Sequence, residues 1–247
     1  MKYVFALLFL LTAGLGLQAE RLPEWMVNLR EAIYEQVLTA EEVRPLYVEA
    51  QAAARRNTSG ANRYLTLSRA EFFMGRALLF EERNREARPH FAEGLRLAER
   101  AVEMSPSADA WVLRAENLAH LIQTSNWTFA MANGLDVERF ARNALEFDSR
   151  NAAAQYLIAA RWIFAPRAFA NINRGIEMMT AILTEGDMAR DDHFNVVSAI
   201  GWAHIQQRNF GDAVPWLRRA LEVYPTNKFA ADLLETAEAG GGRRRSR

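Results

Sequence analysis

The sequence predicts an all-α protein, and three observations support this class. Apolar residues recur every three to four positions along most of the chain, as in the segment after Pro23, where Trp25, Leu29 and Ile33 share one helical face. The 7 prolines and 13 glycines fall mainly between such segments, where one helix ends and the next begins. Runs of alternating β-branched residues, which would indicate strands, are absent from the sequence.

The pattern divides the chain into a series of expected helices. The first covers 23–38, because a proline suits the first turn of a helix. Thr39 to Glu42 is a capping box for a second helix, which must kink or start late at Pro45. The aromatic-rich stretch 126–133 is the least regular part. Further helices are expected at 61–82, from 85 or 89 to 104, and at 107–123, 135–147, 151–163, 171–185, 192–207, 211–223 and 226–238.

Residues 1–19 have the three-part plan of a secretory signal peptide, with Lys2, an apolar run over 3–17 and a small residue at Ala19. That run is shorter than the ~20 residues of a membrane-spanning helix. Cleavage is expected after Ala19, with Gly16 as the rival site, and an uncleaved N-terminal anchor is the competing interpretation. The sequence has no cysteine, which excludes disulfides and a lipoprotein anchor. We therefore expect a periplasmic or secreted chain with no stable membrane insertion.

The clearest internal unit spans Phe194 to Asn227 and is 34 residues long. Its spacing resembles the tetratricopeptide repeat (TPR), in which a small residue lies where two helices cross closely and a proline closes the second helix. His204 departs from the pattern, because a large aromatic residue is usual there. The matching positions are Gly201, Ala213, Leu217, Ala220 and Pro225.

Weaker copies of the same helix ending occur at 101–106 and 144–151. The resemblance implies a TPR-like α-solenoid of antiparallel helix pairs over 61–239. An N-terminal helical pair at 20–60 would precede it, and a disordered basic tail at 240–247 would follow, with Gly240 ending the last helix. An unrelated helical bundle is the alternative interpretation.

The sequence gives little support for a catalytic or metal-binding function. The 4 histidines form no pair at helical spacing, and the cluster Asp191-Asp192-His193 is explained by acids in the first turn of a helix. No motif for a serine nucleophile, a phosphate loop or a metalloprotease is present. The 30 basic and 30 acidic residues balance, so no overall field attracts nucleic acid. We therefore expect no enzyme, no metal and no cofactor.

The repeat alignment instead predicts a binding surface, because the first helices of stacked pairs line a concave face. An apolar, aromatic face with a few polar groups suits a protein or peptide segment, or a small apolar ligand. The leading hypothesis is an exported scaffold that binds a protein or peptide partner. The alternative is a small-ligand-binding accessory protein of a solute transport system. The residues expected on the concave face are Tyr156, Ile163, Asn195, Ser198, Trp202 and Ile205.

Overall fold

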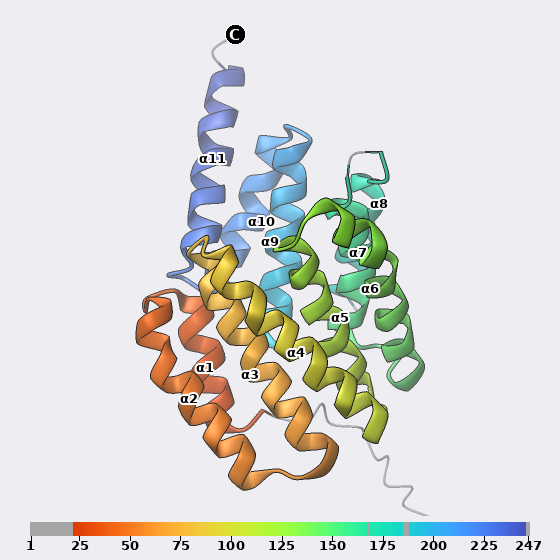
Figure 1. Ribbon diagram of the computed structural model, residues 1–247. Helices are drawn as coiled ribbons and strands as arrows, with labels where there is room; N and C mark the ends of the chain where they lie inside the picture. The colour runs from red at the N-terminus through yellow and green to blue at the C-terminus, as the bar shows by residue number, and fades with distance from the viewer. Residues whose placement is uncertain (1–21, 167, 185–187, 246–247) are drawn as a thin grey trace, which may run out of the picture.

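The computed structural model describes residues 22–166, 168–184 and 188–245, and the predicted signal peptide at 1–19 lies outside them. The described residues form eleven α-helices and no strand, which confirms the all-α class (Figure 1). None of these helices has the length and apolar character needed to cross a membrane. The helices are α1 (Glu24–Glu35), α2 (Ala40–Asn57), α3 (Gly60–Phe80), α4 (Asn84–Met104), α5 (Ala108–Gln123), α6 (Trp127–Phe147), α7 (Ala152–Phe164), α8 (Ile172–Ile182), α9 (Arg190–Gln206), α10 (Phe210–Val223) and α11 (Lys228–Arg245).

Most helix ends follow local signals in the sequence. The expected capping box of α2 is present, because the Thr39 hydroxyl accepts a hydrogen bond from the Glu42 N–H at 3.3 Å and the Glu42 carboxylate accepts one from the Thr39 N–H at 2.8 Å. Helix α2 continues through Pro45. Helix α6 begins at Trp127, earlier than the expected 135, because the Asn126 side chain caps it by accepting from the Phe129 N–H.

The last helix extends beyond its expected end at Gly240 and reaches Arg245. Packing explains why a glycine is accommodated there. A Cβ atom at Gly240 would lie 2.7 Å from the Phe210 ring, so only glycine allows α11 to pass this close to α10. In Figure 1, α11 projects beyond the rest of the molecule.

Successive helices run antiparallel and pack as neighbours, which is the arrangement of a TPR-like α-solenoid (Figure 1). The odd-numbered helices also contact one another in sequence, from α1 with α3 through to α9 with α11. The even-numbered helices pack chiefly on the odd-numbered ones. In a curved stack, helices on the inner side lie closer to one another than helices on the outer side. The odd-numbered helices α1, α3, α5, α7 and α9 therefore line the inner side of the curve.

Close crossings hold the pairs together, and Gly201 lies at one of them as the repeat pattern predicts. A Cβ at Gly201 in α9 would lie 2.6 Å from Leu217 Cγ in α10. The pair α3 and α4 repeats this geometry, because a Cβ at Gly75 would lie 2.6 Å from the Phe91 ring. Both contacts join residues separated by sixteen positions, so α3–α4 and α9–α10 are equivalent units of the repeat.

The solenoid closes on itself, because α1 and its C-cap contact the start of α9, the segment that joins α10 to α11, and the start of α11. The Tyr34 ring of α1 stacks on Tyr224 with centroids 5.1 Å apart and meets the edge of Phe194 at 5.7 Å. The buried Asn227 joins the two ends, since its amide nitrogen donates to the Tyr34 carbonyl at 2.7 Å while its oxygen caps α11 at Ala230. Tyr34, Phe194 and Tyr224 belong to one hydrophobic cluster that also contains α2, α3 and α4 residues.

Candidate functional site

Closure brings side chains from five helices onto one inner surface, and Arg76 of α3 lies at its centre. One Arg76 amino group lies 3.2 Å from His120 Nε2 of α5, and the other donates to Asn195 Oδ1 of α9 at 3.4 Å. The guanidinium carbon lies 5.2 Å from the Tyr34 ring centre and 4.8 Å from that of Phe80. Within the described residues, Arg76 forms no ion pair with a carboxylate, and its buried Nε has no hydrogen-bond partner. Arg76 is therefore held in place by neutral groups.

His120 is kept neutral by its surroundings. Burial, assisted by the neighbouring Arg76 charge, lowers the pKa of His120 to about 3. Its ring stacks on Phe91 with centroids 5.0 Å apart, and its Nδ1 lies 3.0 Å from Gln123 Oε1. A neutral imidazole beside Arg76 adds no positive charge, so the guanidinium carries the charge of this part of the surface.

Acidic groups face the same interior from α5 and α9. Burial raises the pKa of Glu116 to about 7 although Arg69 and Arg76 oppose the shift. Burial, with Asp191 and Glu116 as like charges, also raises the pKa of Asp192 well above its ordinary value. Neither the Glu116 nor the Asp192 side chain forms a hydrogen bond or ion pair with any residue that the structure describes.

The remaining charges of the inner surface do have partners. Arg30 of α1 pairs with Asp191 at 3.2 Å and with Glu31 at 2.7 Å. Arg69 of α3 pairs with Asp109 at 3.6 Å. Within the described part of this surface, Arg76, Glu116 and Asp192 thus have no ion-pair partner, and all three side chains remain partly exposed to solvent.

Four of the residues expected on the concave face retain some solvent exposure. Asn195 contacts Arg76 and donates to the Tyr34 hydroxyl at 3.3 Å. Burial raises the pKa of Tyr156 in α7 to about 12, with Arg76 and Glu116 among the charges that it senses. Trp202 packs against Phe164 with ring centroids 4.9 Å apart.

The other expected residues lie deeper or away from Arg76. Ile205 packs beside Leu217 between α9, α10 and α11. Ile163 is 2% exposed and contacts the position where a Cβ of Gly175 would lie. Ser198 is buried and donates to the Asn195 carbonyl of its own helix. Whether any of these six residues contacts a partner stays a prediction.

Sequence reasoning did not select Arg76, Glu116 or Asp192 as binding residues. A signal was available for the last two, because Glu116 lies four residues before His120 and Asp192 three before Asn195, which places each pair on one helical face. Asp191 and Asp192 do lie in the first turn of α9, as expected for acids at a helix N-terminus. That position accounts for Asp191, which pairs with Arg30, but it leaves the Asp192 carboxyl without a partner.

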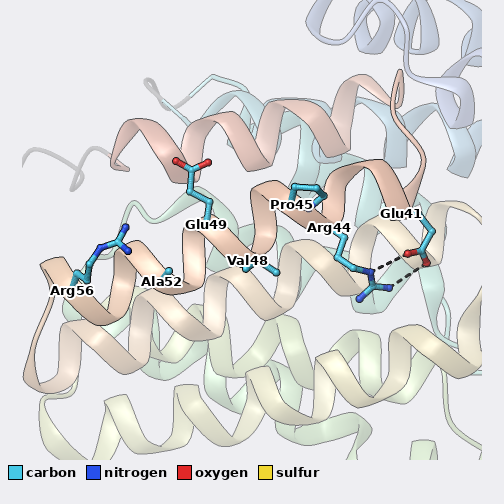
Figure 2. A pocket seen from close by; sticks show the side chains of 7 residues that line it. All are labelled: Glu41, Arg44, Pro45, Val48, Glu49, Ala52 and Arg56. Atoms are coloured by element: carbon cyan, nitrogen blue, oxygen red, sulfur yellow. Dashed lines mark hydrogen bonds and ion pairs between the residues drawn. The ribbon is translucent and has the colours of Figure 1, made fainter.

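Other surfaces of the described chain are weaker candidates for a binding site. No group of three or more metal-ligating side chains occurs among the described residues. A shallow hollow of about 530 Å³ lies on α2, and Figure 2 shows its lining side chains on that single helix. There Arg44 pairs with Glu41 at 3.0 Å. A ligand in this hollow would meet only one helix.

No protein-family model matches the chain, and no curated protein matches it. Among solved structures, the chain is similar to the crystal structure of YrrB, a TPR protein with an unusual peptide-binding site. The TM-score is 0.37 and the identity 14%, over 84% of this chain and 96% of that chain. This similarity is too low to align individual residues, and the TPR-like arrangement rests on the helix pairing described above.

Proposed function

We propose that the protein is an exported, non-enzymatic scaffold that binds a protein or peptide partner on its inner surface. The observation that carries this proposal is the convergence of α1, α3, α5 and α9 around Arg76. Their partly exposed polar and aromatic side chains can match a partner in charge and shape, whereas the hollow on α2 offers one helix face. The candidate base beside Arg76 is His120, whose pKa is lowered to about 3 and whose two ring nitrogens lie beside Arg76 and Gln123, so it is a weak and occupied base, which supports binding over catalysis.

A peptide selection tests this function. Random peptides displayed on phage are selected on the purified chain, and enriched peptides are measured by fluorescence polarisation. We expect enriched peptides to bind at least tenfold more weakly to the Asn195→Ala and Trp202→Ala variants. The Val48→Ala variant, on the exposed face of α2, is the control and should bind normally. Failure to enrich any peptide, or peptides indifferent to both inner-surface changes, would refute the scaffold function.

Export is the second part of the proposal and is supported by Lys2, the apolar run and Ala19. N-terminal sequencing of the protein from its own host should find a mature chain that begins near Glu20 in the periplasm or medium. A chain that keeps Met1 and stays in the cytosol would contradict export.

Closure of the solenoid favours the alternative function, a small-ligand-binding accessory protein of a solute transport system. Packing of Tyr34 against Phe194 and Tyr224 limits the inner surface that an extended chain can reach. Native mass spectrometry of the protein purified from its host separates the two functions. A retained small molecule favours the accessory protein, and a bound polypeptide favours the scaffold.

A further inference from the structure

The inner surface holds one positive and two negative groups without ion-pair partners among the described residues. The positive and negative groups lie at two different heights along the helix axes. Arg76 contacts only neutral groups, and the Glu116 and Asp192 carboxyl groups have no direct partner among the described residues. Burying a charge without a partner costs free energy, so each such group calls for an explanation. Arg69 acts on both carboxyl groups and Arg30 on Asp192, but within the described residues their direct ion pairs are with Asp109 and with Asp191 and Glu31.

Helix geometry places the unpaired groups about one turn apart. Arg76 contacts His120, which follows Glu116 by four residues on α5, and Asn195, which follows Asp192 by three residues on α9. Since a helix rises 1.5 Å per residue, Glu116 and Asp192 lie about 4.5–6 Å nearer the N-terminal ends of these helices than the residues that contact the guanidinium. The positively charged Arg76 and the negatively charged Glu116 and Asp192 therefore lie at two different heights along the helix axes.

Tyr156 lies on α7, which packs on both α5 and α9, the helices that carry Glu116 and Asp192. Arg76, Glu116 and Asp192 are among the charges that act on its pKa. Its hydroxyl forms no hydrogen bond with a described residue and can serve either a carboxylate or a cation. A bound molecule could thus lie along the Tyr156 ring with one end at each height.

We propose that this surface binds a basic residue with a free carboxylate, in which Arg76 holds the carboxylate and Glu116 with Asp192 holds the cationic side chain. A lysine or arginine side chain is long enough to span one helical turn, and the second carboxyl group lets the cation be shared. This inference rests on the proposed inner-surface binding and names its ligand chemistry. The same chemistry occurs in a free basic amino acid and at the C-terminus of a peptide.

The raised pKa values of Glu116 and Asp192 agree with this assignment. Each carboxyl group raises the pKa of the other or shares a like-charged neighbour, so a cation placed between them would relieve repulsion as well as form hydrogen bonds. Glu116 is then half-protonated near neutral pH, and binding of a cation would release its proton.

The test uses the purified chain and a fluorescein-labelled peptide of sequence Gly-Ser-Gly-Ala-Lys with a free C-terminus. Two altered probes separate the charges: the same peptide with an amidated C-terminus, and the peptide with norleucine in place of lysine. We expect both to bind at least tenfold more weakly in fluorescence polarisation. Glu116→Gln and Arg76→Gln should each weaken binding of the parent peptide by tenfold or more.

The matched control variants are Glu93→Gln and Arg96→Gln, which remove the partners of an exposed ion pair on α4. Both should bind like the wild type. Circular dichroism checks folding, and Asp192→Asn replaces Arg76→Gln if the latter unfolds. Equal binding of the amidated or norleucine peptide, or wild-type binding by Glu116→Gln, would overturn the assignment.

Competition identifies the source of the ligand. Displacement of the peptide by free L-lysine at a similar concentration indicates a free amino acid, and displacement only by longer peptides indicates a C-terminus; either supports the shared chemistry. If lysine-ended probes fail while selected peptides still depend on Asn195 and Trp202, the ligand assignment is wrong and the scaffold function stands. If neither kind of peptide binds, both are wrong.

Discussion

Replacing Glu116 by glutamine should make the protein more stable near neutral pH. The carboxyl group has no direct partner among the described residues, and burial raises its pKa from 4.5 to about 7. Each pKa unit corresponds to about 1.4 kcal/mol, so the ionised group destabilises the fold by up to about 3 kcal/mol. Because the side chain is partly exposed and glutamine must still be solvated, we expect a gain of about 1–3 kcal/mol.

The sign of the pH dependence follows from linkage. The folded pKa lies above the unfolded one, so between pH 4.5 and 7 the folded state binds the additional proton. The contribution of Glu116 to stability therefore falls as pH rises through this window, and its full cost is present above pH 7. Asp192 faces the same interior, and burial with the like charges of Asp191 and Glu116 also raises its pKa, whereas Arg69 and Arg30 act on it as opposite charges. The gain from Glu116→Gln should be largest at pH 8 and vanish near pH 4.5.

Urea unfolding followed by circular dichroism at pH 8 and pH 5 measures this difference. Glu93→Gln is the control, because its exposed ion pair with Arg96 contributes about 1 kcal/mol or less. A Glu116→Gln variant that is less stable than the wild type at pH 8 would show that the carboxylate is satisfied in the folded protein. The unpaired-charge description of the inner surface would then be wrong.

Three further predictions concern packing. Gly201→Leu should lower the free energy of unfolding by about 1–3 kcal/mol, because a side chain would collide with Leu217; an unchanged urea midpoint would contradict the close crossing. Trp202→Ala should cost less than Leu217→Ala, for which about 2–5 kcal/mol is expected, because Leu217 is fully buried and Trp202 only partly; thermal unfolding would show the reverse order if Trp202 carries the core. Asn227→Ala should cost about 1–3 kcal/mol and speed hydrogen exchange at Tyr34 in α1, because it removes the amide that joins both ends; unchanged exchange would mean that closure does not depend on it.

The fold was predictable because its signals are local. Apolar spacing and caps such as Thr39 and Glu42 determine where helices lie, and the small residue Gly201 determines how a pair crosses. Where the helices differ from expectation, the cause is a single side chain. The Asn126 cap starts α6 early, and the Phe210 ring explains how α11 passes Gly240.

Closure and the charged surface were not predictable in the same way. The Asn227 contact with Tyr34 spans 193 residues, and it depends on curvature summed over every helix pair between them. Repeat alignment could place Asn195 and Tyr156 on the inner side, since that follows from position within a helix pair. It could not show that Arg76 would meet Asn195, because that contact spans 119 residues and exists only when the solenoid closes.

Closure and ligand binding are physically linked through α9. Arg30 of α1 pairs with Asp191 of α9, whereas the neighbouring Asp192 has no direct ion-pair partner among the described residues. The folded protein therefore already carries the desolvation cost of Asp192 and Glu116 before any ligand arrives. Only the ligand's own polar groups must then lose water on binding. Charge-assisted hydrogen bonds to Asp192 and Glu116 therefore contribute more to affinity than the same bonds to fully exposed carboxylates would. The same reasoning requires that a variant which stabilises the fold here, such as Glu116→Gln, should bind the basic ligand less tightly.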